Sequence, residues 1–198
     1  MALVDRVKGI LLTPKTEWTV IETEPATPAS LYTGYAIPLA AIPALAGFIG
    51  WSVVGINVLG TSIKIPMSDG LVGALARFIG TLLGVFVLAL IIDALAPTFG
   101  GQKSSIQALK VAVYSSTATW VAGIFMIIPS LSILSVLGLY SLYLLYLGLP
   151  QLMKAPADKA VGYTALIVVV GIVLFLLVGA VTNQLVGYGT WARWTPGG

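Results

Sequence analysis

The sequence contains neither cysteine nor histidine, and only 9% of its 198 residues are charged. Without cysteine the chain has no disulfides and no thiolate metal sites, and without histidine it lacks the commonest metal ligand and the usual general base near neutral pH. With 58% hydrophobic residues and a mean hydropathy of +1.02, the chain has too little polar surface to cover a soluble domain of this size. The composition therefore predicts an integral membrane protein.

Long apolar runs fill the chain after its first 30 residues. Each run is long enough to cross a hydrocarbon core, which needs about 20 helical residues. We place five such helices near residues 31–55, 71–96, 107–128, 131–149 and 162–186. The predicted fold class is an all-α integral membrane protein. Its five transmembrane helices lie in residues 31–198, and a short amphipathic N-terminal cytoplasmic arm occupies residues 1–30.

The arm is predicted to begin with an amphipathic helix. The apolar residues that recur at helical spacing on one face are Leu3, Val4, Val7, Ile10 and Leu11. Asp5, Arg6 and Lys8 fall largely on the opposite face. This arrangement favours a short helix that lies in the membrane interface.

A second short helix is expected after this one. Thr13 and Pro14 have the pattern of an N-cap residue followed by proline at the first helical position. The helix is expected to pass Trp18 and Ile21 and to end at Pro25. We expect both arm helices to pack on the inner rim of the bundle, with binding of a specific partner as the alternative.

Several small residues and prolines predict how the apolar segments pack. Pro38 and Pro43 indicate that the first segment is kinked or starts as an irregular helix. In the second segment, the small residues that permit close helix approach are Gly73, Ala76, Gly80 and Gly84. We expect this stripe to pack within the chain, with dimerisation as the alternative. Only Pro129 and Ser130 separate the third and fourth segments, which predicts a tight antiparallel hairpin.

Basic residues are distributed unevenly between the two ends of the predicted helices. Those on the side of the N-terminal arm are Arg6, Lys8, Lys15, Lys103, Lys110, Lys154 and Lys159. Lys64 and Arg193 lie on the other side. Because positive charge is enriched in cytoplasmic loops, this asymmetry predicts a cytoplasmic N-terminus and, with five crossings, a C-terminus outside. Tyr188, Trp191 and Trp194 fit an aromatic belt at the outer interface.

Two ionisable residues fall within the second apolar segment. With a rise of about 1.5 Å per residue, Arg77 lies about 9 Å from the membrane midplane, where its long side chain can snorkel outward. Asp93 lies about 15 Å from the midplane, at the cytoplasmic edge of the hydrocarbon. We expect it to form a structural ion pair with Lys103, Lys110 or Lys154, with a buried proton relay as the alternative.

The fourth segment combines a tyrosine stripe with a predicted stop. Tyr140, Tyr143 and Tyr146 recur every three residues and share one side of the helix, where their hydroxyls need hydrogen-bond partners on neighbouring helices. Gly148 and Pro150 are expected to end the helix, because proline removes a backbone donor and restricts the residue before it.

The link after the fourth segment is predicted to lie at the level of the lipid headgroups. It contains Lys154 and Lys159, and Lys103 and Lys110 lie on the same side of the membrane. We expect these four lysines to form a basic rim that contacts anionic lipid.

The sequence contains no recognisable catalytic constellation. Its serines have no histidine to act as a base, and Asp93 is the only acid in any of the five segments, so neither a carboxylate pair nor a metal site is indicated. Gly100 and Gly101 lack the lysine-serine ending of a phosphate-binding loop. We therefore predict no enzyme activity, no cofactor, no metal and no nucleic-acid partner.

Two stretches resemble the Yip1 domain family of small five-helix membrane proteins. The stronger is YLLYLGLP, followed by KAPADKAVGYT, in residues 143–164. The other is the spacing in the arm of Pro14, Thr16, Glu17, Trp18, Ile21 and Glu24. The resemblance implies a cytoplasmic N-terminus, five helices and, in eukaryotic members, Golgi or endoplasmic-reticulum trafficking with binding of prenylated Rab-type GTPases. Without the long N-terminal region of those members, this chain is similar to the short bacterial branch.

Two classes of function fit these features. The first is a non-enzymatic membrane organiser or adaptor whose cytoplasmic face binds proteins or anionic lipids. The second is a small transporter or channel with a polar path near Asp93 and the stripe of Tyr140, Tyr143 and Tyr146. In either case we expect a multi-pass protein of the bacterial cytoplasmic (inner) membrane, which contacts the lipid bilayer and forms homo-oligomers or binds other membrane proteins.

Overall fold

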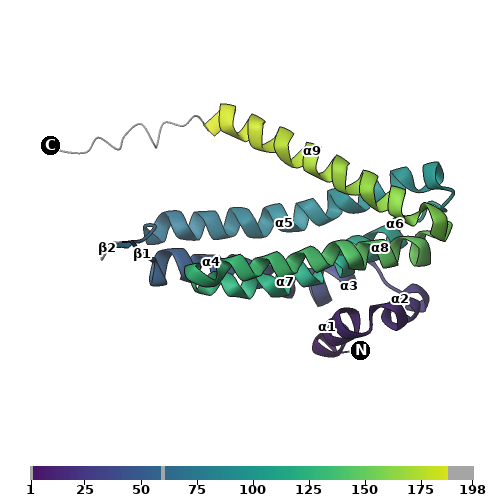
Figure 1. The fold of residues 1–198 in the computed structure, drawn as a ribbon, viewed down its shortest axis with the longest axis horizontal. Helices are drawn as coiled ribbons and strands as arrows, with labels where there is room; N and C mark the ends of the chain where they lie inside the picture. The colour runs from purple at the N-terminus through teal and green to yellow at the C-terminus, as the bar shows by residue number, and fades with distance from the viewer. Residues whose placement is uncertain (1, 59–60, 187–198) are drawn as a thin grey trace.

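The computed structural model describes residues 2–58 and 61–186, which are almost entirely helical (Figure 1). The α-helices are α1 (Leu3–Leu12), α2 (Pro14–Thr23), α3 (Pro28–Leu31), α4 (Ile37–Phe48), α5 (Met67–Leu95), α6 (Ser105–Ser115), α7 (Thr117–Ala122), α8 (Tyr140–Met153) and α9 (Ala160–Val186). Strands β1 (Ile56–Val58) and β2 (Thr61–Ile63) form a small antiparallel hairpin, with Ile56 opposite Ile63. The predicted aromatic belt of Tyr188, Trp191 and Trp194 lies outside the described residues.

Four continuous helical segments within the described residues are long and apolar enough to cross a membrane. They are Pro28–Val54, Met67–Phe99, Ser105–Ile127 and Pro129–Met153. These segments confirm the first four predicted helices. The backbone of α9 confirms a helix in the fifth predicted segment, and Figure 1 shows α9 diverging from the other long helices.

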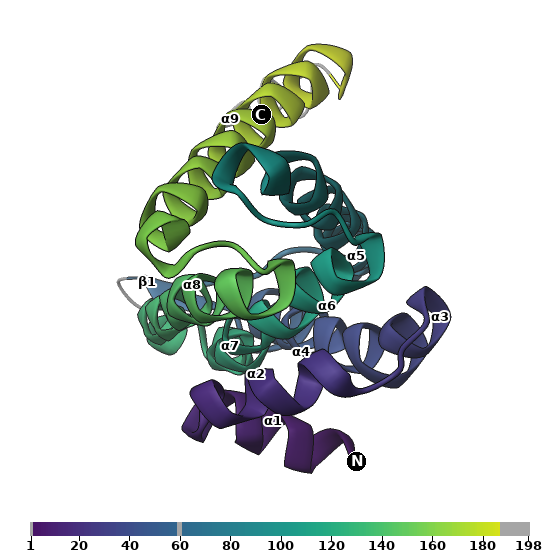
Figure 2. The same cartoon turned by 90° about the vertical axis from the view of Figure 1, so that its right-hand side faces the viewer.

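The arm forms the two predicted helices, α1 and α2. They lie beside the bundle, where α2 packs on α8 and α1 contacts α7 (Figure 2). Thr13 occupies the N-cap position of α2, directly before Pro14, as predicted. Its hydroxyl does not bond to a backbone N–H of α2, because it donates to the Gly9 carbonyl at 3.2 Å. Arg6 was expected on the exposed face, but it is buried, because α2 turns back and brings carboxylates to it.

The first span begins irregularly, as its prolines predict. A capping box starts it: the Thr27 N–H donates to Ser30 Oγ at 2.9 Å, and the Ser30 N–H donates to Thr27 Oγ1 at 3.1 Å. A π-helical stretch, Tyr32–Ala36, joins α3 to α4, and a second one, Ile49–Val54, follows α4. Pro43 lies inside α4, where it removes one backbone donor.

The small-residue stripe of α5 does not pack within the described chain. A Cβ added at Gly73, Gly80 or Gly84 would meet no atom within 4 Å. The expectation of intramolecular packing is therefore wrong for these three glycines. The other helices contact α5 on a different face, where Val85, Ala89 and Ile92 are buried.

The third and fourth spans form the predicted tight hairpin. The third ends in a 3-10 segment, Gly123–Ile127, and the fourth begins in another, Pro129–Leu139. Ile128 alone turns the chain in an extended conformation (φ −114°, ψ 107°). Thr119 Oγ1 and Ser141 Oγ, 2.9 Å apart, join the two spans across the hairpin.

The prediction that the fourth span ends at Gly148 and Pro150 is wrong. The span continues to Met153, because burial of Leu149, Leu152 and Met153 in the core offsets the backbone donor that Pro150 lacks. Lys154 then ends the helix in a left-handed conformation (φ 56°).

Candidate functional site at the N-terminal arm

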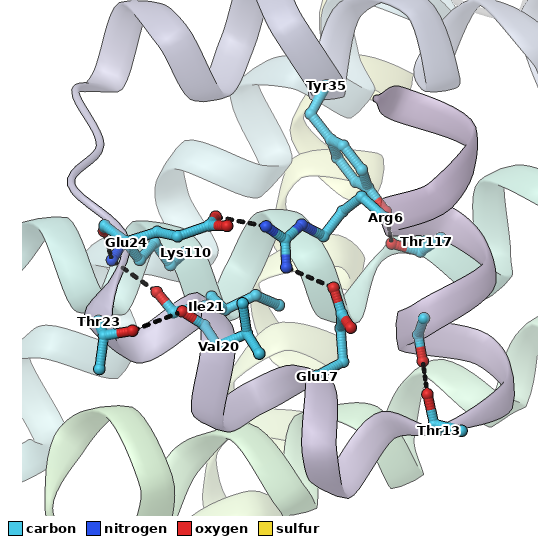
Figure 3. A network of polar contacts seen from close by, with 11 residues as sticks. Arg6, Thr13, Glu17, Val20, Ile21, Thr23, Glu24, Tyr35, Lys110 and Thr117 are labelled. Atoms are coloured by element: carbon cyan, nitrogen blue, oxygen red, sulfur yellow. Dashed lines mark hydrogen bonds and ion pairs between the residues drawn. The ribbon is translucent and has the colours of Figure 1, made fainter. Parts of the chain in front are cut away.

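A buried arginine connects the two arm helices. Arg6 is 4% exposed, and its guanidinium pairs with the carboxylates of Glu17, within α2, and Glu24, just after it (Figure 3). Burial alone lowers the pKa of Arg6, but the hydrogen bond and charge of Glu24, with the charge of Glu17, raise it above its ordinary value. The side chain therefore remains charged, and removing it leaves two carboxylates without their cation.

A second buried cation comes from the third span. Lys110 is 3% exposed, and its Nζ donates to the backbone carbonyls of Ile21 at 2.8 Å, Glu24 at 2.6 Å and Glu22 at 3.4 Å (Figure 3). These carbonyls lie at the C-terminal end of α2, where a cation is favoured by the helix dipole. The structure thus buries Lys110 away from the predicted lipid-contacting rim and makes it one of the residues that hold α2 on the bundle.

Aromatic side chains surround the Arg6 group. The Tyr114 ring lies 5.7 Å from the Arg6 guanidinium and packs edge to face with Tyr35, at 4.7 Å between ring centroids. The Tyr35 hydroxyl is 2.9 Å from Thr117 Oγ1. Trp18 also packs edge to face with Tyr114, with 6.4 Å between the ring centroids. The arm is therefore held by packing as well as by charge.

A cavity of about 210 Å³, the arm cavity, lies between the arm and the first and third spans. Arg6 lines it from the arm, and Lys110 and Tyr114 line it from α6. Leu31 and Tyr35, from the start of the first span, complete the wall. Charged and aromatic groups that are nine-tenths buried thus converge on one space at the end of the bundle.

An ion pair also connects α2 with the end of α8. Glu22 accepts hydrogen bonds from Lys154 and Gln151, and these two contacts lower the pKa of its carboxyl below the ordinary value. The sequence predicts Lys154 in the lipid-contacting rim, but in the structure its charge is paired with the Glu22 carboxylate.

Asp93 makes a different contact from the one predicted. Its Oδ1 accepts a hydrogen bond from the Ser104 N–H at 2.8 Å, and Ser104 is the residue that precedes α6. No described lysine pairs with it, so the expected ion pair with Lys103, Lys110 or Lys154 is wrong. The carboxylate instead satisfies a backbone donor at the start of α6, where negative charge is favoured.

The other two lysines of the predicted rim, Lys103 and Lys159, lie on the links that follow the second and fourth spans, and a hydrogen bond brings these two links together. The Gln102 N–H donates to the Met153 carbonyl at 2.7 Å, and a Cβ on Gly101 would lie 2.8 Å from that same oxygen. The Lys159 Nζ lies 3.7 Å from the position of a Cβ on Gly100. We call residues 100–104 and 154–159 the link platform; Lys103 and Lys159 are exposed on it.

The tyrosine stripe is divided between contacts. The Tyr140 hydroxyl donates to the Leu11 carbonyl of α1 at 3.2 Å, and the Tyr143 ring lies 5.4 Å from the Tyr140 ring. Tyr146 is half-buried. A hydrogen-bonding role is thus confirmed for Tyr140, and its partner lies on the arm instead of on a neighbouring membrane helix.

Sequence reasoning missed the residues at the centre of this site. The helical spacing predicts Arg6 on an exposed face, and nothing in the local sequence distinguishes Tyr35 and Tyr114 from other tyrosines of the spans. The signal was present in the arm pattern, because Glu17 and Glu24 pair with Arg6 and Trp18 packs on Tyr114. Within the described part of the chain, no group of three acidic, histidine or cysteine side chains is placed to hold a metal.

Comparison with known proteins shows the family. The Yip1 domain profile matches residues 8–178, so the chain belongs to the Yip1 domain family, whose members are generally non-enzymatic membrane proteins. The chain is also 28% identical over 191 residues to the inner membrane protein YohC of Escherichia coli K12 and to YohC of strain O6:H1, covering 94% of this chain and 98% of each relative. No solved structure matches it. By this homology it is a multi-pass protein of the inner membrane.

Proposed function

We propose that this protein is a non-enzymatic membrane organiser or adaptor with five transmembrane helices and a cytoplasmic N-terminus. Its link platform would dock proteins or anionic lipids. The observation that carries the proposal is the hydrogen bond from the Gln102 N–H to the Met153 carbonyl, at 2.7 Å. It joins two links that are far apart in sequence into one surface at one end of the bundle.

The charges left exposed on this surface support docking. Lys103 and Lys159 are exposed, and neither forms an ion pair with a described residue. A lysine near an anionic membrane surface contributes about 1 kcal/mol to binding. Lys154 contributes less to the binding of anionic lipid, because its charge is paired with Glu22. Lys110 also contributes less, because it is buried and bonded to backbone carbonyls.

The contacts of Asp93 weigh against the alternative, a small transporter or channel. A proton relay needs a carboxylate that is free to exchange its proton along a polar path. Asp93 instead accepts a hydrogen bond from the Ser104 N–H. Tyr140 belongs to the stripe that was expected to line the path, but its hydroxyl donates a hydrogen bond to the Leu11 carbonyl of the arm.

The proposal is tested by native mass spectrometry in mild detergent, after addition of phosphatidylglycerol or cardiolipin. Lys103→Gln and Lys159→Gln should each reduce the retained anionic lipid at fixed ionic strength. Lys64→Gln is the matched control, because it removes one exposed lysine from the opposite end of the second span. Photo-crosslinkers at positions 159 and 64 test protein docking in the same way. Unchanged lipid retention in both variants, together with no crosslinked protein specific to position 159, would make the proposal wrong.

A further inference from the structure

The arm cavity is built from groups that the adaptor proposal does not use. It is lined by two buried cations, Arg6 and Lys110, by the Glu24 carboxylate and by the buried ring of Tyr114. It lies on the arm side of α6 and shares no lining residue with the link platform. We propose that it binds the phosphoethanolamine headgroup of a zwitterionic phospholipid, a role that goes beyond docking at the platform.

The balance of charge around the cavity selects a zwitterion. Arg6 and Lys110 contribute two positive charges, and Glu17 and Glu24, which pair with Arg6, contribute two negative charges. An anionic headgroup would add an uncompensated negative charge to a space that is already neutral, and burial of such a charge is unfavourable. The phosphate and the ammonium of a zwitterionic headgroup carry opposite charges, so binding both together leaves the net charge around the cavity at zero.

Unused hydrogen-bonding groups are placed for both ends of that headgroup. The Arg6 guanidinium has five N–H donors and gives one to Glu17 and one to Glu24, which leaves donors for a phosphate. The Tyr114 hydroxyl has no hydrogen-bond partner among the described residues. Glu24 binds Arg6 through Oε2, and its side chain is 40% exposed, so its other oxygen can accept from an ammonium. Lys110 holds the wall of the cavity in place and has no donor left for the headgroup, since its three N–H groups all bond to carbonyls at the end of α2.

The position of the cavity indicates that the headgroup belongs to a lipid. Gly34, which lines it, lies six residues into the first span, a depth of about 9 Å along the helix. Gly34 is exposed, and a Cβ added there would meet no atom within 4 Å, so the cavity is open on that side. Apolar side chains of Leu3, Ile21 and Leu31 also line the space and suit the glycerol and first acyl carbons.

The experiment compares retention of phosphatidylethanolamine and phosphatidylglycerol by the full chain in native mass spectrometry. The wild type should retain phosphatidylethanolamine several-fold better. Gly34→Leu, which fills the open side, and Tyr114→Phe, which removes only the hydroxyl, should each abolish that preference. Gly80→Leu and Tyr143→Phe are matched controls, because Gly80 is also an open helical glycine and Tyr143 is an exposed tyrosine of α8, and neither lines the cavity. Both controls should keep the preference.

Three results would overturn the assignment. The first is equal retention of the two lipids by the wild type. The second is retention of phosphatidylethanolamine by Gly34→Leu that equals retention by Gly80→Leu. The third is displacement of the lipid by soluble O-phosphoethanolamine at equal concentration, which would make the free compound the ligand. The Lys103→Gln and Lys159→Gln variants separate this inference from the adaptor proposal, because they should lose phosphatidylglycerol and keep phosphatidylethanolamine.

Discussion

The indole of Trp18 lies directly on the backbone of Gly148. A Cβ on Gly148 would stand 2.7 Å from Trp18 Cζ2 and 2.9 Å from Cη2. The two residues come from the two stretches that carry the resemblance to the Yip1 domain family, and the structure brings them together. Gly148 is therefore needed to admit the ring, and the contact joins the arm to α8.

Gly148→Ala should destabilise the protein, because the added methyl group cannot be accommodated without moving a side chain that is 1% exposed. Overpacking of this kind costs about 1–3 kcal/mol. Thermal unfolding in detergent should show a lower midpoint. Gly80→Ala is the control, since its methyl group would meet open space. Equal midpoints for the two variants would show that Trp18 moves aside freely.

Arg6→Gln should loosen α1 from α2, because Glu17 and Glu24 then lose the cation that joins the two arm helices. Breaking a buried ion pair from one side costs about 3–5 kcal/mol. Hydrogen exchange should rise across α1 and α2, with much smaller changes in α6. Lys8→Gln, an exposed lysine of the same helix, should leave exchange unchanged. Protection of α1 and α2 that is equal in the Arg6→Gln variant and the wild type would mean that the ion pairs of Arg6 are not needed to hold the two arm helices together.

The docking of α2 should weaken at acid pH. Hydrogen bonds from Lys154 and Gln151 lower the pKa of Glu22 in the folded protein. Its contribution is therefore complete above the ordinary pKa of about 4.5 and is lost as the pH falls through the lowered value. Because this pair is largely at the surface, the effect is at most about 1 kcal/mol.

The measurement for this pH effect is hydrogen exchange in α2 between pH 6 and pH 3, corrected for the intrinsic rate. Glu22→Gln should reduce the acid-dependent loss of protection, since it cannot titrate. A pH profile identical in that variant and the wild type would assign the effect to other carboxylates.

Asp93→Ala should lower stability by about 1 kcal/mol, the usual cost of removing a cap. Asp93→Asn should cost less, because the amide oxygen can still accept from the Ser104 N–H. Thermal unfolding of the two variants tests this order. A fully stable Asp93→Asn that abolishes a flux driven by a pH gradient would instead favour the transporter.

Single cysteines test the threading, which the chain allows because it has none of its own. Cysteines at Ser104 and Ala157 should react only with reagents that reach the cytoplasm, and one at Gly197 only from outside. Labelling of position 197 from the cytoplasm would contradict five crossings.

The sequence by itself determined the class of protein and the location of its helices. Apolar runs of about 20 residues have few alternatives to a membrane helix, because every backbone group must find its hydrogen bond within the segment. The arm helices were equally readable from the apolar spacing and from Pro14. The family was also readable, since its two motifs are local in sequence.

Only the tertiary structure decided which charges are buried and where the fourth span ends. Arg6 and Lys110 have the local sequence of surface charges, and their burial depends on carboxylates and carbonyls that lie 11 to 89 residues away. Pro150 has the local sequence of a stop, but packing of Leu149 and Met153 in the core outweighs one missing donor. The periodicity of one segment cannot predict such contacts, because each contact needs a partner from another helix. The contact stabilises the buried residue only once the helices have packed.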